Sequence, residues 1–133
     1  MIQFFSNHKI IFKFINLIFV IFYLYPGSLT GLFVYNDLSR QPQITPDFFN
    51  VSSNHFYVFI IISVLWFLTF YRSGKLNFLV VILILYSVIL EILHMVIPNR
   101  TFQYEDLFGN LFGVIVTIVI FYVFRIYEKN KKS

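Results

Sequence analysis

Four long apolar runs, separated by short polar stretches, make up most of this sequence. They cover residues 10–25, 56–71, 76–97 and 107–127. Each run is longer than the ~9–11 residues of a barrel strand, and none alternates strictly between apolar and polar positions. A helix needs ~20 mostly apolar residues to cross a bilayer core. The pattern therefore predicts four transmembrane helices.

The first run is the least regular of the four. It contains Lys13 near one end and closes at Pro26-Gly27. A lysine at that depth can extend its ammonium group to the lipid head groups, so the position is compatible with a span. A cleaved signal peptide would need a cleavage site of small residues such as alanine. Because the sequence contains no alanine, we expect an uncleaved helix.

Composition places these helices in lipid. Of the 133 residues, 59% are hydrophobic and 12% are charged. A soluble domain carries about 25% charged residues, so this chain has too little polar surface to cover a soluble globule. There is no cysteine, which excludes disulfides and thiolate chemistry. We predict a single all-α integral membrane domain over residues 1–133.

The positions of lysine and arginine predict how the helices are oriented. The net charge is +4, but the basic residues lie at the ends of the apolar runs, which excludes a nucleic-acid-binding surface. Arg40 and Arg100 lie on one side of the membrane. The other eight of the ten basic residues lie on the opposite side, so we predict a plasma-membrane protein with both termini cytoplasmic. These eight are Lys9, Lys13, Arg72, Lys75, Arg125, Lys129, Lys131 and Lys132.

Two segments are predicted to face outward. The longer one joins the first and second helices over residues 26–54, and its stretch Leu32–Tyr35 is apolar enough to lie on the membrane surface. The shorter one, residues 98–106, makes a tight connection between the third and fourth helices. These two helices must therefore run antiparallel.

Polar side chains occur where lipid-facing residues would be expected. Glu91 lies six residues before the outer end of the third helix, about 9 Å deep at about 1.5 Å per residue. Ser87 and His94 lie on the same helix face, at spacings of four and three residues from Glu91. One face of the fourth helix also carries polar and small residues, at spacings of four, three and four. They are Asp106, Asn110, Gly113 and Thr117.

The antiparallel arrangement brings these two faces to the same outer level. His55 opens the second helix at that level, and Arg100 lies in the loop above. An unpaired ionised side chain in mid-membrane costs roughly 2.5–3.5 kcal/mol, so we expect Arg100 or a histidine to pair with Glu91. The predicted outward-facing polar cluster consists of His55, Glu91, His94, Arg100, Asp106 and Asn110.

Some of these residues also have a structural interpretation. Buried polar groups often join membrane helices, at about 0.6 kcal/mol per hydrogen bond, and this applies to Asn110 and Thr117. Gly109 and Gly113 form a small-xxx-small pair, for which close helix packing is the default explanation. Burial of Glu91 and Arg100 costs more, which favours a functional role for these two.

The segment of residues 91–113 resembles the signature of the VanZ-like family. The chain has the Glu, Arg, Asp, Asn and Gly of that signature in register, and His94 stands where the family has Gln. The family also carries an Asp-Lys-x-x-His element at the start of its second helix. His55 matches the histidine, whereas Val51 and Ser52 replace the Asp and the Lys. The matching signature residues are Glu91, Arg100, Asp106, Asn110 and Gly113.

The resemblance implies a four-helix protein of the cell membrane more securely than it implies an activity. The founding member of the family is associated with resistance to the glycopeptide antibiotic teicoplanin. Other members occur widely without a clear tie to antibiotics.

The leading hypothesis is a non-enzymatic or accessory membrane protein that acts at the outer face of the cytoplasmic membrane, where its polar cluster binds a lipid-linked or cell-envelope ligand. Arg100 suits a phosphate or carboxylate because its planar guanidinium donates two parallel hydrogen bonds. We expect His94 and Asn110 to orient that group and Glu91 to hold Arg100 in place. The expected partner is a membrane lipid or a lipid-linked cell-envelope precursor. Association with a second copy, or with other membrane proteins, is compatible with the sequence.

Other function classes stay open. An embedded acid–base enzyme could use His55, Glu91, His94 and Asp106, but the chain has no cysteine and no recognisable serine or threonine nucleophile motif. The same four residues could bind zinc, but their spacing matches no zinc motif, so we predict neither a metal nor a cofactor. A small transporter is less favoured, because the inner halves of the helices carry almost no charge.

Overall fold

Helices account for the regular structure of the part of the chain that the computed structural model describes, which is residue 4 and residues 8–131. No strand is present in these residues, where only an isolated bridge joins Phe48 and Val51. In chain order the helices are α2 (Lys9–Leu24), α3 (Leu29–Tyr35), α4 (Ser53–Phe70), α5 (Leu76–Leu93), the 3-10 helix η1 (His94–Val96) and α6 (Tyr104–Lys131).

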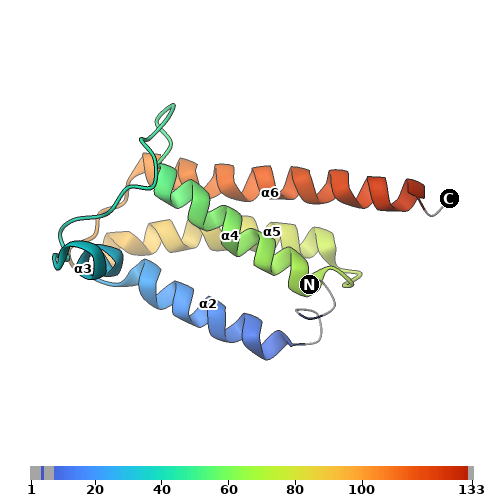
Figure 1. The fold of residues 1–133 in the computed structure, drawn as a ribbon, viewed down its shortest axis with the longest axis horizontal. Helices are drawn as coiled ribbons and strands as arrows, with labels where there is room; N and C mark the ends of the chain where they lie inside the picture. Colours follow the sequence, from blue (N-terminus) through green and yellow to red (C-terminus); the bar gives the residue numbers. More distant parts are fainter. Residues whose placement is uncertain (1–3, 5–7, 132–133) are drawn as a thin grey trace.

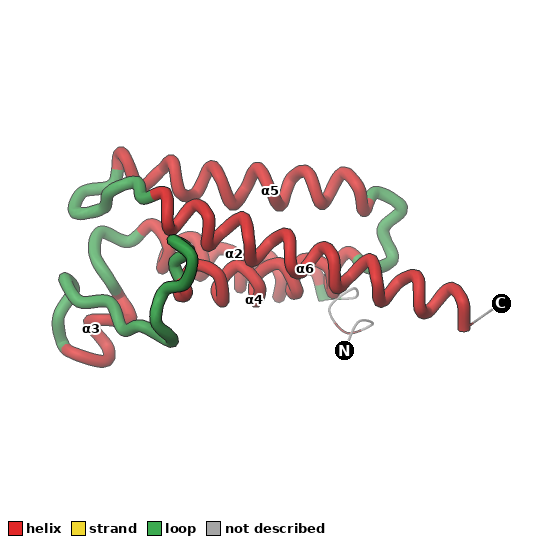
Figure 2. The backbone as a smooth tube through the Cα atoms, turned by 90° about the horizontal axis from the view of Figure 1, so that it is seen from above, coloured by secondary structure: helices red, strands yellow, loops and turns green. Residues whose placement is uncertain are grey.

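Four of the helices lie lengthwise beside one another, and the short α3 lies at one end of them (Figure 1, Figure 2). We call this end the α3 end. It also contains the loop of residues 36–52 and the connection of residues 97–103. The opposite end contains the start of α2, the turn between α4 and α5, and the end of α6.

The predicted all-α class is confirmed, and the predicted spans match the observed helices to within four residues at each end. Three segments are long and apolar enough to cross a membrane: α4, α6 and α5 together with η1. The pair α2 and α3 makes a fourth if it is counted as one span with a bend of 79°. The cytoplasmic placement of the termini stays a prediction. Lys132, one of the residues on which it depends, lies outside the described residues.

The bend between α2 and α3 follows from Pro26-Gly27. Pro26 has no N–H with which to continue α2, and Gly27 has a φ of 101°, which side-chain-bearing residues rarely adopt. Ser28 then begins α3, and its hydroxyl accepts a hydrogen bond from Gly31 N at 2.9 Å. A Cβ on Gly31 would lie 1.6 Å from the Arg40 carbonyl oxygen, so the loop can fold back onto α3 only at a glycine. The chain therefore turns aside after α2 and covers this end of the bundle.

The loop of residues 36–52 is tied to the start of α4. Asn54 donates from Nδ2 to Pro42 O at 2.8 Å and accepts from Ile44 N at 3.0 Å. Asp47 Oδ1 accepts from Ser53 N at 2.9 Å. Because the N–H groups of a first helical turn have no acceptors within the helix, Asp47 stabilises the start of α4. These bonds hold the loop beside the polar residues of the α3 end.

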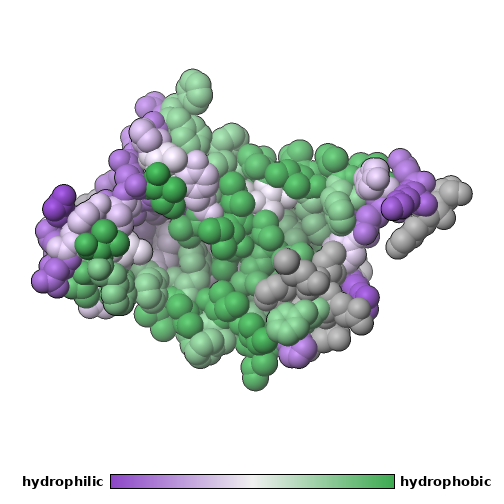
Figure 3. All heavy atoms as spheres, in the orientation of Figure 1, coloured by the Kyte–Doolittle hydropathy of each residue, from purple (hydrophilic) through white to green (hydrophobic). Residues whose placement is uncertain are grey.

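Apolar side chains fill the bundle and also cover its outside. The interior contains Phe59, Leu83 and Val114, each at most 1% exposed. On the face shown in Figure 3, hydrophobic residues form a broad band between two hydrophilic ends. Lipid rather than water is the solvent that suits such a band. Large apolar residues exposed on the outside include Ile18, Ile61, Leu85 and Val119.

The backbones of α4 and α6 pack in close contact through two glycines. A Cβ on Gly109 would lie 2.6 Å from Ser52 O, and a Cβ on Gly113 would lie 2.5 Å from Phe56 O. Real Cβ atoms essentially never approach this closely, so a larger residue at either position would push the helices apart. The approach brings the polar side chains of the two helices into contact.

Candidate functional site

The residues predicted to form the polar cluster all lie at the α3 end. They come from the start of α4, the end of α5 with η1, the connection of residues 97–103 and the start of α6. The structure joins them in a network that also includes a residue from α2. In the same order of elements the predicted residues are His55, Glu91 with His94, Arg100, and Asp106 with Asn110.

Glu91 is completely buried, and both of its carboxylate oxygens accept hydrogen bonds. Oε2 accepts from Tyr23 Oη at 2.8 Å and from Asn110 Nδ2 at 3.5 Å. Oε1 accepts from Gln103 N at 3.3 Å and lies 3.3 Å from His94 Nδ1. Of the two kinds of partner expected for Glu91, the structure therefore provides a histidine.

Tyr23, in the last turn of α2, is the centre of the network, and the sequence pattern does not single it out. Its hydroxyl donates to Glu91, accepts from Asn110 Nδ2 at 2.7 Å and lies 3.1 Å from His55 Nδ1. Its ring stacks on that of His94, with the centroids 4.8 Å apart. A tyrosine at the end of a span is typical of a membrane interface, which hides this role. The sequence does contain one signal for this role. Tyr23 lies near the end of its predicted helix, at the same depth as the polar residues at the ends of the other helices.

Each ring nitrogen of the two histidines faces an oxygen. His94 Nε2 lies 3.0 Å from Tyr23 O, and its Nδ1 faces the carboxylate described above. His55 Nδ1 lies 3.0 Å from Asn110 Oδ1, and its Nε2 lies 3.4 Å from Asp106 Oδ2. Carbonyl and carboxylate oxygens accept hydrogen bonds, so an N–H on either ring finds an acceptor. The imidazoles thus serve as partners for buried oxygens, which lowers the cost of burying these polar groups.

Asn110 joins helices and faces no cavity. It is completely buried, and its Nδ2 donates to Ser87 O at 3.3 Å in addition to its bond with Tyr23. Thr117 lies two turns further along α6, where its hydroxyl donates to Gly113 O at 2.9 Å within the same helix. Asn110 thus has bonds to three neighbouring helices, whereas Thr117 only closes a bond within α6.

Arg100 is held by backbone carbonyls and not by Glu91, so that part of the prediction is wrong. Its Nε donates to Tyr25 O at 3.2 Å, and one terminal nitrogen donates to Gly27 O at 2.7 Å. Tyr25 is the C-cap of α2 and Gly27 lies beyond it, so no N–H of a continuing helix donates to either carbonyl oxygen and both are open to another donor. Among the described residues, no carboxylate lies within 4.0 Å of Arg100. Its remaining N–H groups can therefore serve a ligand.

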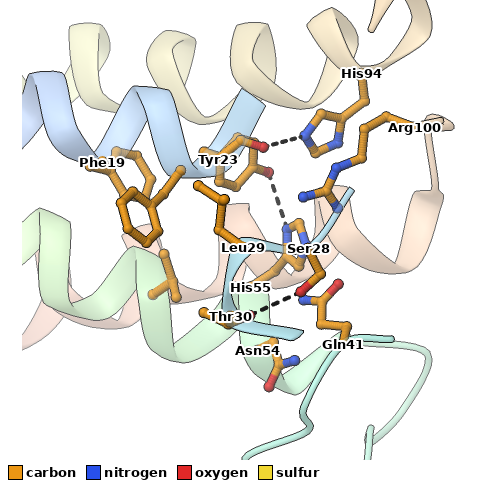
Figure 4. A pocket seen from close by; sticks show the side chains of 12 residues that line it. Phe19, Tyr23, Ser28, Leu29, Thr30, Gln41, Asn54, His55, His94 and Arg100 are labelled. Carbon is orange, nitrogen blue, oxygen red and sulfur yellow. Dashed lines mark hydrogen bonds between the residues drawn. The ribbon is translucent and has the colours of Figure 1, made fainter. Parts of the chain in front are cut away.

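Two cavities lie beside the network. The first, which we call the apolar cavity, has a volume of about 320 Å³ and lies between α2, the start of α3 and α4. Figure 4 shows its lining, with Phe19 and Tyr23 projecting from α2 and Arg100 reaching in from its loop. The apolar part of its wall consists of Phe19, Phe22, Leu29 and Val58.

The second, which we call the polar cavity, has a volume of about 280 Å³ and lies between the loop of residues 36–52, the connection of residues 97–103 and the start of α6. Four residues line both cavities, so the two adjoin. These shared residues are Gln41, Asn54, His94 and Arg100. Residues found in the polar cavity alone include Asp47, Asn99, Thr101, Gln103 and Asp106.

A metal ion could find three donors in the network. One ligand atom from each of His55, Glu91 and Asp106 lies within 4.8 Å of the others. However, both oxygens of Glu91 already accept hydrogen bonds, and His55 Nδ1 already faces Asn110. His94, which completed the alternative zinc set, has Nε2 opposite a carbonyl oxygen. The geometry fits an internal network of ion pairs and hydrogen bonds better than an open metal site.

Comparison with known proteins concerns the whole chain. The family model described as VanZ/LLP1 matches residues 3–125, which is nearly the full length. The match confirms the resemblance inferred from the segment of residues 91–113. No curated protein and no solved structure matches the chain.

Proposed function

Because the chain belongs to the VanZ/LLP1 family, we propose that it is a multi-pass protein of the cytoplasmic membrane that binds a phosphate-bearing amphiphile at its α3 end. In this proposal both termini are cytoplasmic and the α3 end faces outward, as the distribution of basic residues predicts. The ligand is a membrane lipid or a lipid-linked cell-envelope precursor. Both combine an apolar chain with a phosphate group.

The observation that carries the proposal is an apolar cavity adjoining a polar one, with Arg100 lining both. An acyl or isoprenoid chain in the apolar cavity would contact Phe19, Phe22 and Val58, and the head group would enter the polar cavity. Moving a chain from lipid into an apolar cavity gains little, because lipid tails are as apolar as the side chains. Recognition must therefore come mainly from the head group.

Arg100 is the residue best suited to the phosphate. Its bonds to Tyr25 O and Gly27 O fix the guanidinium, and no carboxylate among the described residues neutralises it. A fixed guanidinium loses little conformational entropy when it forms two parallel hydrogen bonds to a phosphate. His94 also lines both cavities, but its two ring nitrogens face Glu91 Oε1 and Tyr23 O, so it forms part of the wall beside Arg100.

The other predicted ligand residues divide into two groups. Glu91 and Asn110 are completely buried and do not line either cavity, so we assign them the positioning of His94, His55 and Tyr23. Asp106 lines the polar cavity and is a candidate contact to the head group.

The bilayer offers a route into the apolar cavity. Phe22 lines this cavity and is also exposed on the outside of α2. The neighbouring wall comes from α4, and α2 has only two buried side chains, Phe12 and Tyr23. A lipid chain could therefore enter from the membrane between α2 and α4.

A second candidate function is an embedded acid–base enzyme acting on the same class of amphiphile. The observation that favours it is the contact between His55 Nε2 and Asp106 Oδ2, which lie 3.4 Å apart. His55 lines the apolar cavity and Asp106 lines the polar cavity. A carboxylate that orients an imidazole is a common general acid–base arrangement. This candidate predicts that wild-type protein in vesicles converts the lipid head group and that Asp106→Asn stops the conversion. Lipid mass spectrometry that finds no product with wild-type protein would remove the candidate.

The proposed binding function is tested by mass spectrometry of lipids that remain with the protein purified from its membrane. We expect wild-type protein to retain a phosphate-bearing amphiphile and Arg100→Ala to lose about tenfold or more of it, since hydrogen bonds to charged groups contribute about 1.5–3 kcal/mol each. Arg72→Ala is the matched control, because Arg72 follows α4 at the opposite end and lines neither cavity. Equal retention by both variants and wild type would contradict the proposal.

A further inference from the structure

The polar cavity carries charged side chains of both signs. Arg100 contributes a positive charge, and Asp47 and Asp106 contribute carboxylates. Among the described residues, neither carboxylate pairs with Arg100. The opposite charges therefore line the same space of about 280 Å³ without neutralising each other.

Both carboxylates keep an oxygen for a ligand. Asp47 uses Oδ1 to accept from Ser53 N at 2.9 Å. Asp106 uses Oδ2 opposite His55 Nε2 at 3.4 Å. Within the described part of the chain, the second oxygen of each has no hydrogen-bond donor. Carboxylate oxygens of this kind accept hydrogen bonds from an ammonium group.

A head group with phosphate alone fits this cavity poorly. Its negative charge would approach Arg100 but would also lie in the same small space as two carboxylates, which repel it. A head group that adds an ammonium group would turn that repulsion into attraction.

We infer that the head group of the bound amphiphile is zwitterionic, with its phosphate at Arg100 and its ammonium group at Asp47 and Asp106, as phosphoethanolamine would provide. The inference rests on the proposed function, because it specifies the head group of the same amphiphile. It also commits to a lipid, since the adjoining apolar cavity of about 320 Å³ is suited to a chain.

The test uses purified protein incubated with mixed micelles that contain equal amounts of phosphatidylethanolamine and phosphatidylglycerol with identical acyl chains. Native mass spectrometry measures the ratio of the two lipids retained. We expect wild-type protein to enrich phosphatidylethanolamine about threefold to fivefold, and the double variant Asp47→Asn with Asp106→Asn to lose that enrichment. Asparagine keeps an oxygen that can accept from Ser53 N, while it removes the negative charge and replaces the other oxygen by an amide nitrogen, which repels an ammonium group.

Glu105→Gln is the matched control, because it removes a carboxylate next to Asp106 that lines neither cavity. It should keep the wild-type ratio. A wild-type ratio equal to that of the micelles, with Arg100→Ala still releasing both lipids, would overturn this inference and leave the proposed function standing. Retention of neither lipid would count against both.

Soluble phosphoethanolamine separates the lipid from its free head group. Because the lipid is concentrated in the same micelle as the protein whereas the soluble compound is diluted in water, we expect it not to displace phosphatidylethanolamine when added at equal total concentration. Complete displacement would contradict the assignment of a lipid and would favour a soluble head-group compound as the ligand.

Discussion

The two ends of the bundle use polar side chains differently. At the opposite end they bond in separate pairs: Tyr71 donates to Glu128, and Tyr122 donates to Asn77 at 2.8 Å. At the α3 end, buried side chains from four helices and η1 share one continuous network, and two cavities lie beside it. The members of that network are Tyr23, His55, Glu91, His94 and Asn110.

This difference distinguishes polar contacts that only join two helices from polar side chains that form a candidate functional site. A pair such as Tyr122 with Asn77 joins two helices and leaves the rest of the structure independent of it. In the network, a single side chain has several partners on different helices, so its loss leaves several buried groups without a partner. The following substitutions compare the two ends, and their expected effects decrease in order.

The largest effect is expected for Glu91→Ala. The substitution removes the acceptor of Tyr23, Gln103 and His94 from a fully buried position. Loss of one partner from a buried ion pair costs about 3–5 kcal/mol. Urea unfolding in detergent micelles, compared with wild type, measures this change in the free energy of unfolding.

Glu128→Ala is the control for that measurement at the opposite end. Glu128 is only half-buried and accepts from Tyr71. Because partly exposed pairs contribute little, we expect this variant to lose less than about 1 kcal/mol. Equal losses of unfolding free energy in the two variants would show that the network only joins helices, as the partly exposed pair of Tyr71 and Glu128 does.

Tyr23→Phe tests the centre of the network without changing the packing of the ring. It removes a hydroxyl that bonds to Glu91, His55 and Asn110. A buried hydrogen bond with a charged partner contributes about 1.5–3 kcal/mol, so we expect a loss of about 2–3 kcal/mol in the same unfolding assay. Tyr122→Phe, which removes one exposed bond, should stay within about 0.5 kcal/mol of wild type. A Tyr23→Phe variant as stable as Tyr122→Phe would remove Tyr23 from its central place.

Gly113→Ala tests the contact that brings α4 and α6 together. Its Cβ would lie 2.5 Å from Phe56 O, so the helices must move apart. Overpacking of this kind costs about 1–3 kcal/mol, and we expect the lower half of that range because the helices can slide in lipid. Gly74→Ala is the control, since nothing lies within 4 Å of a Cβ there. Equal midpoints of thermal unfolding for the two variants would argue against a close contact.

Much of the fold could be predicted from the sequence because the decisive signal is local. An apolar run long enough to cross a bilayer predicts a helix wherever it lies in the bundle. The same holds for the polar faces of α5 and α6, because a short connection leaves them only one way to face each other. Glu91 and Asn110 could therefore be placed together from their spacing alone.

The remaining features depend on contacts that no spacing rule describes. Tyr23 reaches the network from α2, a helix that no short connection ties to α5 or α6. Arg100 bonds to carbonyl oxygens, and a backbone acceptor has no signature in the sequence. The prediction offered Arg100 or a histidine as the partner of Glu91 and expected Glu91 to hold Arg100, because it could compare only side chains as partners. The helix break at Pro26 exposed a different set of acceptors.

The two cavities were also beyond prediction, because the fold of a loop forms one of their walls. Gln41 and Asp47 reach the site only because Asn54 and Ser53 tie the loop of residues 36–52 to α4. In sequence, this loop shows only prolines and scattered polar residues. Its role becomes visible when its backbone hydrogen bonds are known.

Arg100→Lys has the smallest expected effect on stability and the sharpest meaning for the comparison. A lysine can still donate to Tyr25 O or Gly27 O, so the free energy of unfolding should change by less than about 1 kcal/mol. Retention of the phosphate-bearing lipid should nevertheless fall about tenfold, because the N–H bonds of a tetrahedral ammonium group diverge and cannot form the two parallel hydrogen bonds that a planar guanidinium donates to a phosphate. Arg72→Lys, at the opposite end, should change neither quantity. If Arg100→Lys lowered stability and left lipid retention intact, the role of Arg100 would be to join helices and not to bind a ligand. The two ends of the bundle would then differ only in the number of hydrogen bonds between their helices.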